Sequence, residues 1–224
     1  MISKLRIILA PALALSTSLA LAAPVSWTDW TTLSATSPGV LGSLVVGSTT
    51  VGVTYSGAYS FAQTSGGTNY WVEGSPAAYT GSALVDNAPP AADIIALNAG
   101  GLKTITFSQA VVDPLIALVS WNGNTVDFGV PIEIVSYGLG YWGSGTPVLN
   151  GSGTGFFGSG EVHGVIRLPG SYSSISFTDT SENWHGITVG VVGLAGNNVP
   201  EPASLALLGI GLAGLGALRR RRTA

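Results

Sequence analysis

Short stretches in the middle of the chain alternate apolar and polar side chains with a period of two. Residues 103–108 read Lys-Thr-Ile-Thr-Phe-Ser, which places Ile105 and Phe107 on one side of an extended chain, and residues 174–178 alternate in the same way. Such alternation is typical of a β-strand with one buried face. Residues 115–121 are apolar at nearly every position, which predicts a central strand buried on both faces.

Turn residues separate further short apolar runs. Residues 44–46 and 51–55 flank Gly47-Ser48-Thr49-Thr50, a pattern that predicts a β-hairpin. Asn122-Gly123-Asn124 is a second turn, after which residues 125–128 are expected to return in a hairpin-like arrangement. The remaining predicted strands are residues 69–73, 93–97, 132–137, 162–168 and 187–192.

Two segments are expected to lack long strands. Residues 76–90 read mainly as loop, and residues 138–160 hold nine glycines, which predicts a long loop or short edge strands. The body shows no helical stripe of apolar residues. About nine to eleven short strands with this spacing predict an all-β fold, a single antiparallel β-sandwich that resembles a jelly roll.

The N-terminal segment has the composition of a secretory signal peptide. Lys4 and Arg6 precede an apolar run, residues 7–21, and Ala20-Leu21-Ala22 offers a small-x-small cleavage site. An uncleaved signal anchor is the alternative. We expect residues 1–22 to be a removable signal helix, so that the folded body spans residues 23–198.

The C-terminal segment, residues 199–224, has three parts. An almost uncharged run at residues 203–218 would reach roughly 24 Å as a helix, against a hydrocarbon core of about 30 Å. This predicts a short transmembrane helix, and the arginines after it would remain on the cytoplasmic side. The flanking parts are a Pro-containing motif, Val199, Pro200, Glu201 and Pro202, and a basic cluster, Arg219, Arg220, Arg221 and Arg222.

The order and spacing of these three parts resemble the PEP-CTERM sorting signal of exported proteins in Gram-negative bacteria that make extracellular polysaccharide. The resemblance covers residues 199–222. It implies processing by exosortase, a membrane cysteine transpeptidase, and an inner-membrane intermediate that is later released or re-attached at the cell surface or in the matrix. An ordinary C-terminal membrane anchor is the alternative for this segment.

The charge of the body excludes several classes of partner. Outside the two terminal segments only Lys103 and Arg167 are basic, whereas ten residues are acidic, which gives a net charge of about −8. Nucleic-acid binding through phosphate neutralisation needs clustered Lys and Arg, so no nucleic-acid partner is expected. The chain has no cysteine, which excludes disulfides and thiolate chemistry.

Few residues suggest catalysis or metal binding. Glu161 and His163 are two positions apart on a predicted strand, so their side chains are expected to share a face. His185 follows Asp179, Glu182 and Asn183. A metal site or an acid/base pair could be drawn from these groups. A weak calcium site formed by Asp179, Glu182 and backbone carbonyls is one alternative, and a polar turn followed by a hydrogen-bonded histidine is the other. We expect no catalytic residues and no cofactor.

Aromatic side chains give a better functional indication. All six tryptophans lie in the body, and Tyr141-Trp142 sits within the Gly-rich segment, where a loop can expose both rings. Trp71 and Trp121 are expected to be core residues. Tyr141 and Trp142 are therefore the candidate contacts to a glycan.

Three functions follow from the sequence. The first is a non-enzymatic surface or matrix protein, sorted by exosortase and associated with exopolysaccharide or biofilm. The second is a glycan-binding β-sandwich module. The third is an extracellular polysaccharide hydrolase, which requires two carboxylates about 5 to 9.5 Å apart in a cleft.

Overall fold

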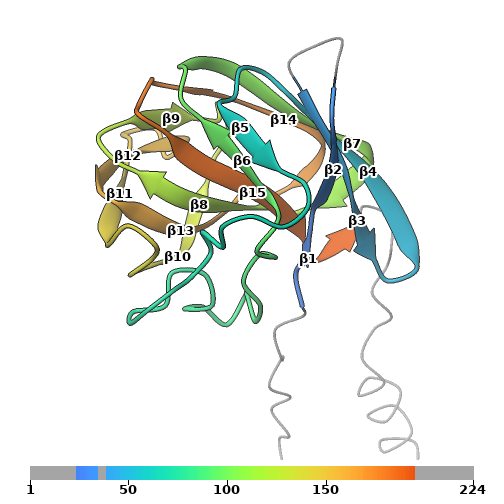
Figure 1. The fold of residues 1–224 in the computed structure, drawn as a ribbon, viewed down its shortest axis with the longest axis horizontal. Coiled ribbons are helices and arrows are strands. Elements are labelled where there is room, and N and C mark those ends of the chain that lie inside the picture. Colours follow the sequence, from blue (N-terminus) through green and yellow to red (C-terminus); the bar gives the residue numbers. More distant parts are fainter. Residues whose placement is uncertain (1–23, 35–38, 195–224) are drawn as a thin grey trace, which may run out of the picture.

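The computed structural model describes residues 24–34 and 39–194, which form two β-sheets packed face to face (Figure 1). The paired strands of both sheets are antiparallel, and no helix occurs in the described ranges. The predicted all-β antiparallel sandwich is confirmed. The predicted signal helix, residues 1–22, and the predicted sorting tail, residues 199–224, lie outside the described residues.

The first sheet, sheet A, has seven strands in the order β10-β13-β8-β15-β6-β5, with β1 paired beside β6 on the same edge of β15. Its strands are β1 (Ser26–Trp27), β5 (Phe61–Gln63), β6 (Ile94–Leu97), β8 (Leu115–Trp121), β10 (Glu133–Tyr137), β13 (Val162–Arg167) and β15 (His185–Val191).

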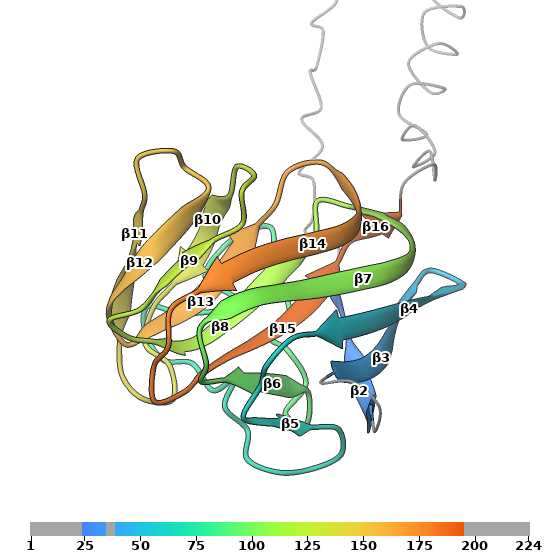
Figure 2. The ribbon, with the colours of Figure 1, turned by 90° about the horizontal axis from the view of Figure 1, so that it is seen from above.

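The second sheet, sheet B, has nine strands in the order β11-β12-β9-β14-β7-β4-β3-β2, with β16 paired to the end of β7. Figure 2 shows the long strands β7 and β14 side by side in this sheet. Its strands are β2 (Asp29–Leu33), β3 (Gly39–Val46), β4 (Thr49–Ser56), β7 (Gly101–Val112), β9 (Thr125–Asp127), β11 (Gly145–Leu149), β12 (Gly155–Gly160), β14 (Ser171–Asp179) and β16 (Gly193–Leu194).

Eight of these strands have the order of a jelly roll. β6, β15, β8 and β13 are neighbours in sheet A, while β7, β14, β9 and β12 are neighbours in sheet B. Taken alone, these strands cross between the sheets at every step along the chain except from β9 to β12. This arrangement interlocks two Greek keys and brings distant segments of the chain together at each end of the sandwich.

The inward side chains of both sheets form the main hydrophobic core. Ile105 and Phe107 on β7 belong to it, as their alternation predicted, and Ile116 and Leu118 face them from β8. Lys103 lies in phase with Ile105 and Phe107 and is only 1% exposed. A charged side chain is thus enclosed on the buried face of β7.

The outer face of sheet A is covered by the long segment between β5 and β6, drawn in teal in Figure 1. Trp71 and Tyr79 from this segment pack with Ala117 and Val119, which point outward from β8. Tyr79 also donates a hydrogen bond from its hydroxyl to the carbonyl oxygen of Leu118, at 3.3 Å. β8 is therefore buried on both faces, as its continuous apolar sequence predicted.

Two expectations need correction. Residues 69–73 form no strand, because Trp71 packs on sheet A from within the covering segment. Residues 125–127 do not return beside β8: β9 pairs with β12 and β14 in the opposite sheet. The Gly-rich segment, residues 138–160, contains the short strands β11 and β12 at one edge of sheet B, which agrees with the predicted short edge strands. The short strands β1, β2, β5 and β16 were not predicted.

Truncation of the core between the sheets should destabilise the protein strongly. Leu118 is 1% exposed, so Leu118→Ala is expected to lower the free energy of unfolding by about 2 to 5 kcal/mol. Leu102 on β7 is 67% exposed, so Leu102→Ala serves as the matched control and should change it by less than about 0.5 kcal/mol. Urea unfolding measures both values, and equal losses would contradict the assignment of the core.

Candidate functional site

A pocket opens where the end of β8 meets the starts of β13 and β15. These ends meet because β8 runs antiparallel to both neighbours. The cavity has a volume of about 310 Å³. Its lining combines carboxylates, amides, a hydroxyl and two indole rings: Ser120, Asn122, Trp142, Glu161, Glu182, Asn183 and Trp184.

A β-bulge in β8 turns Ser120 toward this pocket. The register between β8 and β13 shifts between Val162 and Gly164, and Ser120 has a φ of 55°. A left-handed conformation is uncommon for a residue with a side chain, and bulges often redirect side chains at functional sites. The Ser120 hydroxyl donates a hydrogen bond to Oε2 of Glu161 at 2.5 Å. The strained conformation of Ser120 thus serves to hold a carboxylate in the pocket.

Asn122 links the two carboxylates of the pocket. Its side-chain Nδ2 donates to Oε1 of Glu161 at 2.6 Å, and its backbone N–H donates to Oε2 of Glu182 at 3.4 Å. Glu161 and Glu182 are therefore placed in one cavity by a shared neighbour. Neither basic side chain of the described residues lines it, because Lys103 is paired with Asp179 and Arg167 with Glu133.

A buried polar cluster lies behind Glu182. His185 donates from Nε2 to Oδ2 of Asp179 at 2.9 Å, and its Nδ1 lies 3.1 Å from Nδ2 of Asn124. Oε2 of Glu182 lies 3.3 Å from the same Nδ1. Oδ1 of Asp179 forms an ion pair with Lys103, and both of these side chains are fully enclosed. The cluster therefore joins the interior of the sandwich to the wall of the pocket.

Aromatic rings form the other wall of the pocket. Trp142 is 52% exposed, and its ring centroid lies 6.4 Å from that of Trp184. The ring centroid of Tyr141 lies 4.8 Å from that of Trp142 and 5.1 Å from that of Tyr70. The ring centroid of Tyr70 in turn lies 5.1 Å from that of Trp184. These contacts support one another, so the two indole rings are held at the pocket by neighbouring aromatic side chains.

His163 anchors the loop that carries Trp142. The backbone N–H of Trp142 donates to Nε2 of His163 at 3.4 Å, and the Tyr79 hydroxyl lies 3.4 Å from Nδ1. Gly140 packs on the same ring, where an added Cβ would approach Cγ of His163 to 2.3 Å. Only glycine fits so closely, and the loop is thereby fixed against β13.

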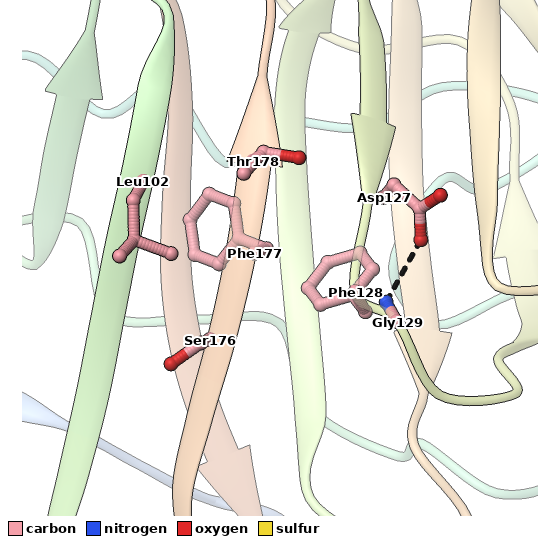
Figure 3. A pocket seen from close by; sticks show the side chains of 7 residues that line it. All are labelled: Leu102, Asp127, Phe128, Gly129, Ser176, Phe177 and Thr178. Carbon is pink, nitrogen blue, oxygen red and sulfur yellow. Dashed lines mark hydrogen bonds between the residues drawn. The ribbon is translucent and has the colours of Figure 1, made fainter.

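Two other hollows offer fewer charged side chains to a ligand than this pocket does. One, of about 290 Å³ on sheet B, contains Phe128 and Phe177 with a single charged side chain, Asp127, which accepts a hydrogen bond from the Gly129 N–H at 2.8 Å (Figure 3). The other, of about 380 Å³, is lined in part by Gly138 and Ser144, which flank the turn that carries Trp142. Its lining is neutral: Pro76, Tyr137, Gly138, Ser144, Gly145, Thr146 and Ser159.

The structure separates Glu161 from His163, which the sequence paired, but it brings Asp179, Glu182 and His185 together as the sequence grouped them. Glu161 faces the pocket, whereas His163 is buried behind the loop. Glu182 lines the pocket, whereas both oxygens of Asp179 are engaged by Lys103 and His185. No group of three or more His, Cys, Asp or Glu side chains that could hold a metal ion occurs in residues 24–34 and 39–194. The calcium site stays a prediction, and the engagement of Asp179 disfavours it.

Trp142 lies in an exposed loop, as the sequence predicted, but several residues that line the pocket with it were not predicted. Ser120, Asn122 and Trp184 were not singled out as candidates. The buried ion pair had a signal in the sequence, because Lys103 and Asp179 each lie in phase with the apolar residues of their strands. Two opposite charges on two buried faces predict a pair, since an isolated charge is costly to bury.

The comparisons with known proteins concern the C-terminal segment alone. The model of the PEP-CTERM protein-sorting motif matches residues 198–222. The chain carries a PEP-CTERM protein-sorting motif. The predicted resemblance is confirmed. The motif implies that the protein is exported by a Gram-negative bacterium and is processed by exosortase. The motif residues and the predicted transmembrane helix lie outside the described residues.

No curated protein and no solved structure matches the chain. Among the described residues, none belongs to a helix long and apolar enough to cross a membrane. The PEP-CTERM motif therefore identifies how the protein is sorted, and it assigns no activity to the body.

Removing the buried cation should be costly. Lys103→Met would leave the Asp179 carboxylate enclosed without its ion-pair partner, so the free energy of unfolding is expected to fall by about 3 to 5 kcal/mol. Arg167→Met is the matched control, because the Arg167–Glu133 pair is 28% and 50% exposed and should contribute less than about 1 kcal/mol. Chemical unfolding of the two variants measures the difference, and similar losses would rule out a structural role for the buried pair.

His163 should make stability depend on pH. Burial lowers the pKa of His163 from 6.5 to about 4, although nearby Glu161 partly opposes this shift. Between these values the unfolded chain binds a proton that the folded protein does not. The free energy of unfolding contributed by His163 is therefore present above about pH 6.5 and is lost as the pH falls to about 4.

Replacing His163 tests this dependence. We expect the stability of His163→Gln, relative to the unmodified protein, to rise on the order of 3 kcal/mol between neutral pH and pH 4. Asp93, whose pKa is raised by burial to about 6, acts in the opposite direction, but it is common to both proteins and cancels in the difference. Denaturant unfolding across this pH range gives the result. Parallel pH profiles would show that His163 does not titrate as described.

Proposed function

We propose that this protein is a non-enzymatic surface or matrix protein that binds extracellular polysaccharide in the pocket at the end of β8. One observation carries the proposal. Trp142 and Trp184 flank a cavity of about 310 Å³ that also contains Glu161 and Glu182. Aromatic faces beside a few fixed polar groups are the usual composition of a small-molecule or sugar site.

The two kinds of side chain have different roles in sugar binding. An indole ring offers an apolar face on which the C–H surface of a sugar ring stacks, and it loses little conformational entropy when it does so. Carboxylates and amides accept and donate hydrogen bonds to hydroxyl groups. Trp142 and Trp184 supply the first contact, and Glu161, Glu182 and Asn122 supply the second.

The position of the pocket suits a protein held through its C-terminal segment. β15 begins beside the pocket at His185 and ends at Val191, which pairs with Ser26 of β1. The sorting motif begins at residue 198, soon after β15 in the sequence. Seven strand residues span roughly 23 Å at about 3.3 Å per residue, so the pocket lies well away from the point where the chain continues toward the sorting motif.

An extended polymer has more than one place to make contact. The pocket and the neutral hollow of about 380 Å³ border the same loop, the first through Trp142 and the second through Gly138 and Ser144. Glu161 and Ser159, only two residues apart, line the two hollows respectively. Successive sugars of one chain could therefore occupy both sides of the loop.

The histidines support a binding role over a catalytic one. His163 and His185 are fully buried and do not line the pocket. Both oxygens of Glu161 already accept hydrogen bonds, from Ser120 and Asn122. The polar groups of the pocket are thus arranged to hold Glu161 in a fixed orientation.

A second candidate is a polysaccharide hydrolase, favoured by the presence of Glu161 and Glu182 in one cavity. Such enzymes use two carboxylates on either side of the bond that is cleaved. Incubation with the polysaccharide distinguishes the two functions. New reducing ends that disappear in Glu161→Gln would favour the hydrolase, whereas an intact polymer that stays bound favours the binding protein.

Loss of the exposed indole should weaken polysaccharide binding. Trp142→Ala is expected to lower the affinity for the exopolysaccharide of the producing bacterium by roughly 30-fold, the size of a binding hot spot of about 2 kcal/mol. Phe157→Ala is the matched control, because Phe157 is an exposed aromatic on β12 that does not line the pocket. Affinity electrophoresis in gels that contain the polysaccharide measures both, and unchanged mobility shift in Trp142→Ala would contradict the proposed site.

A further inference from the structure

The charge of the pocket restricts the kind of sugar that fits it. Glu161 and Glu182 both line the cavity, and Lys103 and Arg167, the two basic side chains of the described residues, are paired with Asp179 and Glu133. A uronic acid or a sulfated sugar would meet two carboxylates with no cation between them. A positively charged sugar would meet complementary charge on entering the same cavity.

We infer that the pocket binds an amino sugar that carries a free ammonium group. The inference rests on the proposed function, because it specifies which unit of a polysaccharide occupies the site. Glucosamine and galactosamine units that are not N-acetylated belong to this class. The carboxylates would pair with the ammonium group, while an indole ring would stack on the sugar.

The hydrogen bonds of the pocket leave room for this ligand. The two oxygens of Glu161 each accept one hydrogen bond from the protein, at 2.5 Å from Ser120 and at 2.6 Å from Asn122. A carboxylate has about four acceptor positions, so about two remain for a ligand. An ammonium group has three N–H donors and no acceptor, and it can therefore be shared between Glu161 and Glu182.

The aromatic wall favours the same charge. A cation above the face of an indole ring is attracted by its quadrupole, and tryptophan is the strongest partner for this contact. Trp142 and Trp184 line the cavity together with both carboxylates. Glu161 and Glu182 are themselves partly buried, so their attraction for a cation is screened less than that of exposed acids.

The strained backbone gives a further reason to expect a specific site. Ser120 adopts a φ of 55° within β8, and its hydroxyl is directed to Glu161. A left-handed residue that is not glycine costs free energy, which the fold has to offset elsewhere. The structure thus stabilises one orientation of a carboxylate in a cavity, an arrangement that a merely solvated acidic surface does not need.

Three oligosaccharides of similar length test the inference by isothermal titration calorimetry. The full chain, solubilised in detergent micelles, is titrated in mildly acidic buffer with a glucosamine hexamer, an N-acetylglucosamine hexamer or an oligogalacturonate. Salt at about 0.15 M limits long-range attraction, because the screening length is then about 8 Å. We expect the cationic hexamer to bind at least tenfold more tightly than the neutral one and the oligogalacturonate to bind least.

Matched charge variants show whether the pocket itself makes the selection. The double variant Glu161→Gln with Glu182→Gln should reduce binding of the glucosamine hexamer to the level of the neutral hexamer. The control double variant Asp29→Asn with Asp86→Asn removes the same charge from exposed residues outside the pocket and should leave binding unchanged. Equal losses in the two double variants would mean general attraction to an acidic protein and would overturn the inference.

The remaining outcomes separate the inference from the proposed function. Equal binding of the cationic and neutral hexamers, both lost in Trp142→Ala, would overturn the choice of an amino sugar and leave the polysaccharide site in place. Binding that requires added calcium would also overturn it, because the carboxylates would then hold the metal. Failure of all three oligosaccharides and of the native polysaccharide to bind would remove both proposals.

Discussion

The buried ion pair between Lys103 and Asp179 holds together the end of the sandwich that carries the pocket. Both residues belong to sheet B, on β7 and β14, whereas His185, which donates to the other oxygen of Asp179, begins β15 in sheet A. Enclosing these charges is costly, so the cluster is stable only when every partner is in place. The connection between Asp179 and His185 contains Glu182 and Trp184, and the ion pair therefore fixes the ends of a segment that supplies one carboxylate and one indole ring to the pocket.

Ser120 and Glu161, which also line the pocket, are positioned by the pairing of β8 with β13. β8 is buried on both faces, by the core on one side and by the segment between β5 and β6 on the other, so its path is strongly constrained. The bulge at its end releases Ser120 from the regular ladder and directs it to Glu161. A rigid strand that ends in one irregular residue is a common way to place a functional group accurately, because the scaffold determines the geometry and the bulge determines the direction.

Local pattern predicted much of the fold and less of the site. The alternation in residues 103–108 and the apolar run in residues 115–121 specify strand faces, and both were confirmed. Residues 125–127 were misplaced because a turn at Asn122-Gly123-Asn124 is compatible with a hairpin, while their actual partners, β12 and β14, lie far along the sequence. The pocket was harder still to predict, since Ser120, Trp142, Glu161 and Trp184 converge only through the pairing of distant strands. Trp142 was recognisable because it lies in a Gly-rich segment, where a loop can expose an aromatic ring.

The PEP-CTERM motif implies export and processing, and we propose that the body binds a sugar between Trp142 and Trp184. The most direct test is the indole N–H region of a nitrogen–proton correlation spectrum, recorded while an oligosaccharide is added to labelled protein. The chain has six tryptophans, of which Trp27 and Trp30 are buried, do not line the pocket and provide internal controls. If the sugar binds there, the Trp142 and Trp184 signals shift saturably while those of Trp27 and Trp30 stay unmoved. Shifts confined to other tryptophans, or none at all with the native polysaccharide, would contradict this proposal.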